Sequence, residues 1–167
     1  HTLGVRDTAM HLAELYNESS EKAELAAVIH DVAKYADVDW MRDMVHLHNL
    51  DPRLLPWNSE ILHGPVGAVI AQQEFNIDDE DILNAIRHHT TGRPKMSQLE
   101  KIIYVADMIE PNRKFDGVEK LRAKAEMDLD KAMHACICHT LTFLVDTKQP
   151  IYPLSIECYN DFMREEF

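Results

Sequence analysis

The sequence predicts an all-α protein made of a single helical bundle domain that spans residues 1–167. Its 167 residues are the usual length of one domain. Apolar residues recur three and four positions apart along nearly the whole chain, which is typical of helices with one buried face. No stretch sustains the alternation of apolar and polar residues that marks a half-buried strand. We therefore expect helices only.

The helices are expected where an apolar face is bounded by capping residues or prolines. In chain order they cover about residues 3–16, 20–33, 39–48, 65–75, 79–89, 99–109, 129–145 and 155–163. The segment 23–33 is apolar nearly all round, which predicts a buried central helix. Loops are expected around Pro52 and Pro56, in 90–96 and in 148–153, where proline or glycine interrupts the pattern.

Individual residues predict several of the helix starts. Ser20 can cap the second helix and Ser155 the last one, because a serine hydroxyl can accept a hydrogen bond from an unpaired backbone N–H. Pro65 suits the first turn of its helix, where the missing N–H would be unpaired anyway. Ser97, with Glu100 three residues later, forms a capping box.

The composition excludes several classes of function. Seventeen Lys and Arg against 29 Asp and Glu give a net charge of −12, without the basic face that a nucleic-acid binder needs. No run of about 18 apolar residues occurs, so no membrane span is expected. Three cysteines form no disulfide framework, which indicates a reducing, cytoplasmic compartment. The chain opens at His1 without an initiator Met, so we expect a preceding segment to be missing.

The adjacent pair His30–Asp31 stands in the most apolar of the predicted helices. Such a dipeptide also arises by chance in a chain with ten His. Its position is more informative, because burying a carboxylate without a partner is costly. The pair is therefore either a polar pair within the core or part of a site that holds a cation, and position alone leaves both interpretations open.

Four further residues favour the second interpretation. His1, His63, His89 and Asp107 each lie at or inside a predicted helix, so one bundle core could gather them with His30 and Asp31. Imidazole nitrogens and carboxylate oxygens are ligands that Fe, Mn, Co, Ni and Zn accept. Four His and two Asp suffice for two divalent ions, which can together activate a water and hold a phosphate oxygen. We expect His63 to precede a helix and His89 to end one.

Longer strings of residues carry a resemblance to a known family. In the order of its motifs the chain is similar to the HD superfamily of metal-dependent phosphohydrolases: His1-Thr2, His30-Asp31, His63-Gly64, His89-Thr90 and Asp107. It resembles the symmetrical dinucleoside-tetraphosphate hydrolases of that superfamily from end to end, through HDVAK (30–34), AIRHHTTGR (85–93), EKIIYVAD (100–107), IEPNR (109–113) and PIYPLS (150–155). These strings are far more specific than the His–Asp pair.

The resemblance implies a helical HD-type domain and a role for each site residue. His1, His30, Asp31 and Asp107 would bind one metal, iron in the family, with Mn, Co, Ni or Mg as substitutes. His63 and His89 would complete a second metal position or meet the substrate phosphates, and Asp31, His63, His89 and Lys34 would act in catalysis. The nucleotide would be held next to His1 and Asp107 by Lys34, Thr90, Arg113 and the loop Pro150, Ile151, Tyr152, Pro153, Leu154 and Ser155.

Two positions depart from the family pattern. His88 stands where an aromatic residue is usual, so we interpret it as a neighbour of the site and not a ligand. Ser155 stands where Thr is commoner, which keeps the hydroxyl.

The same residues also have ordinary structural interpretations. Lys34 follows Asp31 by three residues and can face the same cavity, but a surface lysine with a buried stem fits equally. Arg113 could bind a phosphate with two N–H groups or be a solvated loop arginine. The 150–153 loop could read a base edge or simply connect two helices.

The predicted activity is cleavage of diadenosine tetraphosphate into two ADP, and the predicted partner is this small nucleotide, with a homodimer also compatible. Two alternatives are another HD-type phosphohydrolase (a nucleotidase or a guanosine-tetraphosphate hydrolase) and a non-catalytic module that senses metal and nucleotide. The segment 136–139, Cys-Ile-Cys-His, is not expected to bind metal, because residues two apart on a helix diverge by about 200°. His11, His46, His48, His134 and His139 are expected to have no function.

Overall fold

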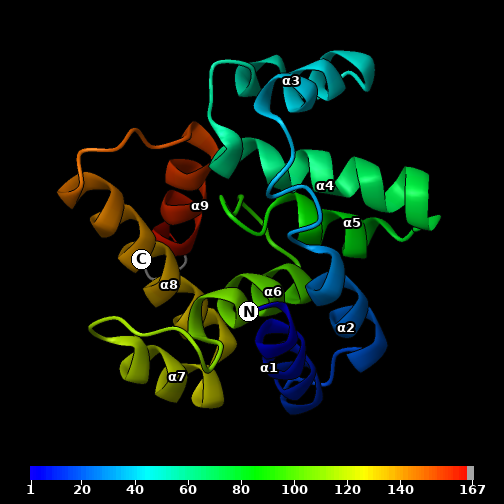
Figure 1. Ribbon diagram of the computed structural model, residues 1–167. Coiled ribbons are helices and arrows are strands. Elements are labelled where there is room, and N and C mark those ends of the chain that lie inside the picture. Colours follow the sequence, from blue (N-terminus) through cyan, green and yellow to red (C-terminus); the bar gives the residue numbers. More distant parts are fainter. Residues whose placement is uncertain (165–167) are drawn as a thin grey trace.

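The computed structural model describes residues 1–164, and within that range the chain consists of helices joined by turns and loops. Nine α-helices and one short 3-10 helix follow one another among these residues, without a strand (Figure 1). They are α1 (Thr2–Leu15), α2 (Ser20–Ile29), α3 (Val38–Leu47), η1 (Pro52–Leu54), α4 (Ser59–Phe75), α5 (Glu80–Arg87), α6 (Gln98–Ile109), α7 (Val118–Met127), α8 (Leu129–Asp146) and α9 (Pro153–Arg164). The prediction of an all-α fold is confirmed. None of the described helices is long and apolar enough to cross a membrane.

Helix α6 lies at the centre of the bundle. It contacts α1, α2, α5, α7 and α8, so elements from both ends of the sequence meet on it (Figure 1). Almost every side of α6 is buried, including Leu99, Ile102 and Ile103. The capping box predicted from Ser97 and Glu100 is present at its start. A continuous apolar helix with a strong start signal thus forms the core that positions the site.

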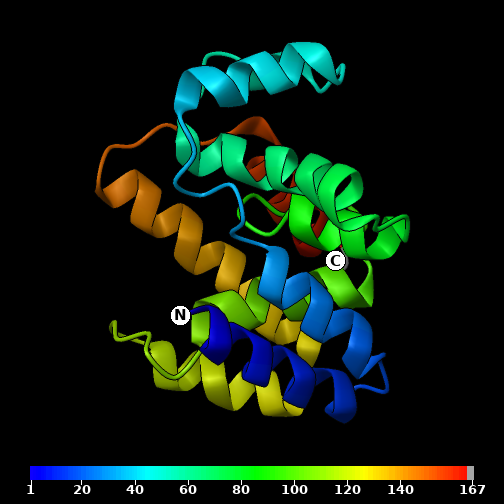
Figure 2. The same cartoon turned by 45° about the vertical axis from the view of Figure 1, so that its right-hand side comes forward.

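A second, smaller core lies at one end of the molecule. It joins α3, η1 and the first half of α4, and it includes the buried side chains of Met41, Leu62 and Tyr152. Figure 2 shows α3 lying over α4 and away from the α6 core. The loop before α9 reaches this layer through Tyr152, whose ring packs edge-on against that of Trp57, with 5.2 Å between the ring centroids.

Helix α2 differs from its prediction in extent and in burial. It ends at Ile29, its cap is Ser19 rather than Ser20, and residues 30–35 form successive turns. Small residues such as Ala26 face the interior, where they let α1 approach closely, whereas Val28 is 47% exposed. The apolar run therefore forms a half-exposed helix. The helices that contact α2 pack on its alanine side and leave the side of Val28 open to solvent.

The starts of α4 and α9 also differ from the prediction. Helix α4 begins at Ser59, so Pro65 lies inside it and His63 belongs to the helix instead of preceding it. Helix α9 begins at Pro153, and Ser155 does not cap it, because its buried hydroxyl donates a hydrogen bond to the carbonyl of Thr91 at 2.9 Å.

Helix α7 was not predicted. It buries only Val118, Leu121 and Ala125, so its apolar pattern is too sparse to stand out from a charged surface segment.

Candidate metal centre

Five segments of the bundle bring six histidine and aspartate side chains to one place. They are His1 at the start of α1, His30 and Asp31 in the turn after α2, His63 in α4, His89 in the turn after α5, and Asp107 in α6. Helices α1, α2 and α5 all pack on α6, and α4 packs on α5, so residues about 100 positions apart become neighbours. The six residues singled out in the sequence lie together.

The carboxylate of Asp31 is at the middle of the group. Its Oδ2 lies 3.2 Å from His30 Nε2 and 3.7 Å from His1 Nε2. Its Oδ1 lies 3.2 Å from His63 Nε2 and 3.3 Å from His89 Nε2. One carboxylate oxygen therefore faces each of two histidine pairs.

Asp107 approaches the first pair from α6. Its Oδ1 lies 2.8 Å from His1 Nε2 and 3.7 Å from His30 Nε2. Three sets of side chains have donor atoms within 4.8 Å of one another, the spacing that a shared metal ion requires: His1–His30–Asp31, His30–His89–Asp107 and Asp31–His63–His89. The arrangement offers two adjacent positions for a cation, both sharing Asp31.

Backbone carbonyls orient three of the imidazoles. His30 Nδ1 lies 2.5 Å from the carbonyl oxygen of Ala27, His63 Nδ1 lies 3.0 Å from that of Ser59, and His89 Nδ1 lies 2.8 Å from that of Ile86. A carbonyl only accepts hydrogen bonds, so each Nδ1 must carry the proton that it donates. The three Nε2 atoms then turn their lone pairs towards the centre, which is the orientation that metal-binding histidines need.

Two observations indicate that this centre fits a metal ion. The buried Nε2 of His30 has no hydrogen-bond partner within the described residues, although it lies close to Asp31. The Nε2 atoms of His63 and His89 lie 3.0 Å apart, and two facing lone pairs at that distance need a cation between or beside them. The described side chains alone do not supply one, and a divalent ion would satisfy all three nitrogens.

The electrostatics of the group also favour a cation. Burial opposes protonation of His30, but the carboxylates of Asp107 and Asp31 outweigh it and raise the pKa of His30 to about 10. Burial alone would raise the pKa of Asp31, yet its contacts with His30, His63 and His89 hold it far below the usual value. Burial lowers the pKa of His89, which keeps that imidazole neutral. The carboxylates therefore attract a positive charge, and a metal ion can take the place of the proton on His30.

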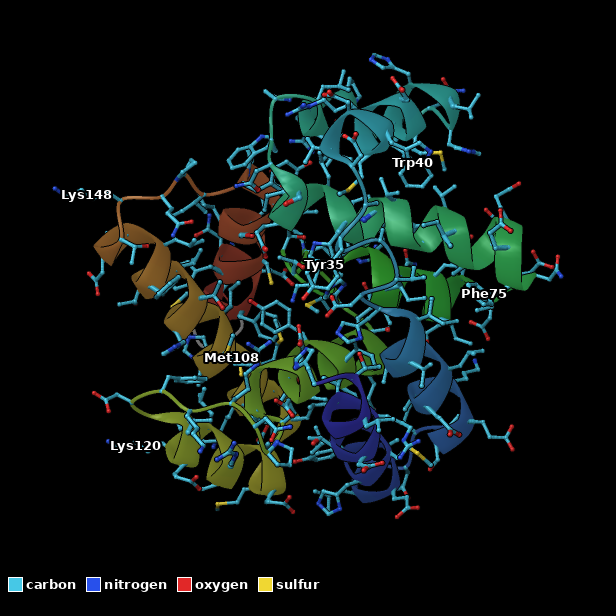
Figure 3. The ribbon with its side chains drawn as sticks, viewed as in Figure 1. Tyr35, Trp40, Phe75, Met108, Lys120 and Lys148 are labelled. Atoms are coloured by element: carbon cyan, nitrogen blue, oxygen red, sulfur yellow. The ribbon has the colours of Figure 1, made fainter. Side chains whose placement is uncertain are left out.

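A cavity of about 690 Å³ opens over the group. Its lining includes Asp31, His63, His89 and Asp107, and two cationic side chains border it. Lys34 Nζ lies 3.7 Å from Asp31 Oδ2, and Arg113 Nη2 lies 3.1 Å from Asp107 Oδ1. Figure 3 shows Met108 on the part of α6 that faces α8, where it lines the same cavity. The volume is in the range of sites for small organic ligands.

Most of the residues predicted to hold a nucleotide border this cavity. Its walls include Lys34, Thr90, Arg113, Pro150, Tyr152 and Ser155. Ile151, Pro153 and Leu154 are not among the lining residues, and Leu154 packs against the smaller core instead. His88 lies with its Nδ1 3.2 Å from Glu100 Oε1 and outside the group of six, as expected of a neighbour.

An aromatic part of the cavity lining was not predicted from the sequence. Trp57, Tyr104, Phe115, His139 and Phe143 all border the cavity, and His139 had been set aside as having no function. One signal was available for the last two, because they stand four positions apart and share a face of a helix whose other face is apolar. Cys136, in the segment that was not expected to bind metal, and Cys158 are both buried, and burial raises the pKa of both thiols to about 12.

An all-α bundle that collects four histidines and two aspartates under a cavity with Lys and Arg at its border has the features of a helical metal-dependent enzyme. The family model described as HD domain matches residues 1–112, and the chain belongs to the HD family. The matched part runs from α1 to α6 and contains all six residues. Helices α7–α9 lie beyond it, and α8, α9 and the loops before α7 and before α9 supply part of the cavity wall.

Two relatives are similar to this chain over most of their length. It is 49% identical over 166 residues to a protein of Halalkalibacterium halodurans, covering 99% of this chain and 89% of the relative. It is 48% identical over 160 residues to one of Bacillus subtilis, covering 96% and 86%. Both relatives are named "Bis(5'-nucleosyl)-tetraphosphatase, symmetrical".

A solved structure shares the fold. The crystal structure of a "predicted HD superfamily hydrolase involved in NAD metabolism" from Clostridium acetobutylicum has a TM-score of 0.93 and 44% identity, covering 99% of this chain and 88% of that one.

Proposed function

We propose that this chain is a metal-dependent hydrolase that cleaves diadenosine tetraphosphate symmetrically into two ADP. The observation that carries the proposal is the gathering of four imidazoles and two carboxylates under a cavity bordered by Lys34 and Arg113. The names of the relatives from Halalkalibacterium halodurans and Bacillus subtilis give the substrate class.

The metal is a divalent ion, and the centre holds two. His1, His30, Asp31 and Asp107 hold the first ion, and His63 and His89 complete a second position with Asp31 or meet the substrate phosphates directly. The resemblance to the family favours iron. Mn, Co, Ni or Mg can substitute for it, because nitrogen and carboxylate ligands accept all of these ions to some degree. Bound there, the ions supply an acidified water and positive charge for phosphate oxygens.

The side chains of the cavity bind and orient the phosphate chain. Arg113 is fixed by two contacts with Asp107, from Nη2 to Oδ1 at 3.1 Å and from Nε to the carbonyl oxygen at 2.9 Å. Its remaining N–H groups can donate to a phosphate oxygen, and the Lys34 ammonium group, which also borders the cavity, can do the same. Both neutralise charge that gathers on the phosphoryl oxygens as the central anhydride bond breaks.

Asp31, His63 and His89 act at the point of attack. The attacking water loses a proton and adds to an inner phosphorus, and the bond from this phosphorus to the bridging oxygen breaks to release ADP on each side. Where His63 and His89 meet the substrate directly and do not bind an ion, their Nε2 atoms can accept this proton, because backbone carbonyls hold each ring through Nδ1. No covalent intermediate with the enzyme is involved.

The remaining partner assignments stay predictions. The net charge of −12 argues against a nucleic-acid partner, and we propose a cytoplasmic location. A homodimer is compatible with the sequence, but Cys158 and Phe162, two apolar residues of α9, are buried within the chain and add no support for it. The prediction of a homodimer must be tested by sedimentation.

Product analysis tests the proposal directly. The anaerobically purified chain is analysed for bound metal and then incubated with diadenosine tetraphosphate in the presence of Fe, Mn or Co, and the products are separated by ion-exchange chromatography. ADP as the sole product is expected. AMP with ATP would refute symmetrical cleavage, preference for a nucleotide monophosphate or guanosine tetraphosphate would indicate another HD-type activity, and metal binding without turnover would indicate a sensor.

A further inference from the structure

One wall of the cavity has no role in the metal centre or in the predicted nucleotide loop. It is formed by α8 together with the loop between α6 and α7. The rings of Phe115 and His139 lie 4.5 Å apart with an interplanar angle of 30°, and both border the cavity. Phe143, one turn further along α8, is 54% exposed and also borders it. We call Phe115, His139 and Phe143 the aromatic wall.

The aromatic wall lies beside the proposed phosphate-binding residues. Phe115 follows Arg113 by two residues, and Arg113 contacts Asp107 of the metal centre. A planar group attached to a phosphate chain could therefore reach this wall while its phosphates stay near Arg113. Partly exposed aromatic rings at the edge of a polar cavity are typical of sites where a nucleobase stacks.

The wall lies apart from the other aromatic end of the cavity. Tyr152 packs on Trp57 beside the loop that was predicted to hold a nucleotide. His139 lies seven residues before the end of α8 and thus ~10 Å along the helix axis from the start of that loop. Figure 1 shows the loop before α7 and the loop before α9 near different ends of α8. One cavity thus has two separate aromatic areas, with the metal centre on its floor.

We propose that Phe115 and His139 bind the second purine ring of the substrate, while the first lies at the Trp57–Tyr152 end. This inference rests on the proposed function and goes beyond it by assigning a site to each base. A substrate with two identical nucleosides can occupy two base sites at once. If each base is anchored at its own end, the middle of the phosphate chain lies over the histidine and aspartate residues, which explains symmetrical cleavage. Stacking on a ring face tolerates different bases, so dinucleoside tetraphosphates with other purines are also substrates.

Two substrates that differ in the number of bases test this inference. Diadenosine tetraphosphate carries two adenosines, whereas adenosine 5'-tetraphosphate has the same phosphate chain and only one. The variants are Phe115→Leu, which keeps an apolar side chain but removes the aromatic face, His139→Leu, and Phe115→Tyr, which restores a ring. Phe75→Leu is the matched control, because Phe75 is 53% exposed at the end of α4, far from α8 (Figure 3).

Loss of one base–aromatic stack corresponds to a fall in binding affinity of roughly 5- to 150-fold. Phe115→Leu is therefore expected to lower kcat/KM for diadenosine tetraphosphate by about tenfold or more, mainly by raising KM, and to change kcat/KM for adenosine 5'-tetraphosphate by less than about threefold. His139→Leu should act in the same direction, and Phe115→Tyr and Phe75→Leu should resemble the wild type. His139 is on the cavity surface, so its variant tests the wall even if Phe115→Leu folds poorly.

Equal losses for both substrates, or no loss for either in both leucine variants, would overturn the second base site while leaving the proposed function intact. A wild-type chain that leaves diadenosine tetraphosphate uncleaved with Fe, Mn and Co would instead refute the proposed function, and the second base site with it.

Discussion

Replacing Gly4 by alanine perturbs the metal centre without altering any of its six residues. Gly4 lies in the first turn of α1, and a Cβ atom built on it would lie 2.1 Å from Oε2 of Glu110 and 3.2 Å from its Cδ. The Glu110 side chain is only 1% exposed, and its Oε1 lies 3.5 Å from His1 Nδ1. The missing side chain at position 4 thus makes room for a carboxylate that faces the outer nitrogen of His1.

The size of the effect follows from this geometry. Real Cβ atoms essentially never come closer than 3.0 Å to a neighbour, so the Glu110 oxygen must move by about 0.9 Å or more in Gly4→Ala. The carboxylate would then no longer orient His1 towards Asp31 and Asp107. Losing such an outer partner of a metal-binding histidine typically costs ~10- to 100-fold in metal affinity. The helix itself should gain ~0.5–1 kcal/mol from Gly→Ala, so weaker metal binding would not reflect weaker folding.

A double-mutant cycle with a metal titration tests this prediction. Metal affinity is measured by competition with a chelator for the wild type, Gly4→Ala, Glu110→Ala and the double variant, together with thermal melting of the metal-free proteins. Each single variant should lose ~10-fold or more in affinity. The double variant should be no weaker than Glu110→Ala, because that substitution removes the atoms that Gly4→Ala displaces.

Two further variants make the test specific. Glu110→Gln keeps an oxygen that can accept from His1 Nδ1 and should restore most of the affinity. Gly67→Ala is the matched control, because its Cβ would meet only ordinary contacts of 3.5 Å or more in α4. Unchanged metal affinity in Gly4→Ala, or losses that add in the double variant, would show that Glu110 does not act through His1.

Three other predictions concern the centre and its surroundings. Asp31→Ala should abolish turnover and metal content with little change in helical circular dichroism, because it removes the carboxylate that faces all four imidazoles; a variant that kept its metal and activity would place the site elsewhere. Arg113→Ala should raise KM and weaken ADP binding by about tenfold or more through loss of a charged hydrogen bond. Elemental analysis should find the same metal content as in the wild type, and loss of metal would contradict a phosphate-binding role. Burial opposes ionisation of Glu100, but its contacts with His88 and Arg93 outweigh it and lower the pKa to about 2. A pKa that folding lowers stabilises the protein above the pKa of the unfolded chain, and this stabilisation is lost as pH falls. In urea unfolding, the free energy of unfolding of the wild type should therefore exceed that of Glu100→Gln by an amount that shrinks between about pH 4.5 and pH 2, by up to roughly 3 kcal/mol. An advantage that stayed constant with pH would refute the assigned cause.

The parts of the fold that were predictable are those governed by local chemistry. The apolar period of α6 and its capping box from Ser97 and Glu100 suffice to define a buried helix. Helix α7 was missed because only three of its residues are buried and its remaining surface is charged. The start of α4 was displaced because Pro65 was interpreted as a first-turn residue, although a helix that begins at Ser59 contains it.

The site was predictable to the extent that its residues have distinctive chemistry. The four histidines and two aspartates stand out by type and by motif, and they lie together. Phe115 and His139 carry no such motif, and only the packing of α8 against the loop after α6 makes their rings neighbours. Phe115 and His139 stand 24 positions apart, so no local pattern pairs them and spatial structure was needed to find this contact.

Among the C-terminal ends of the helices, the largest misplacement lies at the end of α2, beside the metal centre, and the geometry gives a reason. Adjacent residues on an α-helix point about 100° apart, so a helix continued through His30 and Asp31 would direct the two side chains to different sides. In the structure α2 ends at Ile29, and the following turns let His30 Nε2 and Asp31 Oδ2 lie 3.2 Å apart in the same group. A local bond from His30 Nδ1 to the Ala27 carbonyl, three residues back, fixes the imidazole in this turn. The local pattern therefore fails at the point where two consecutive residues join one group of candidate ligands, and such failures of local rules are expected at functional sites.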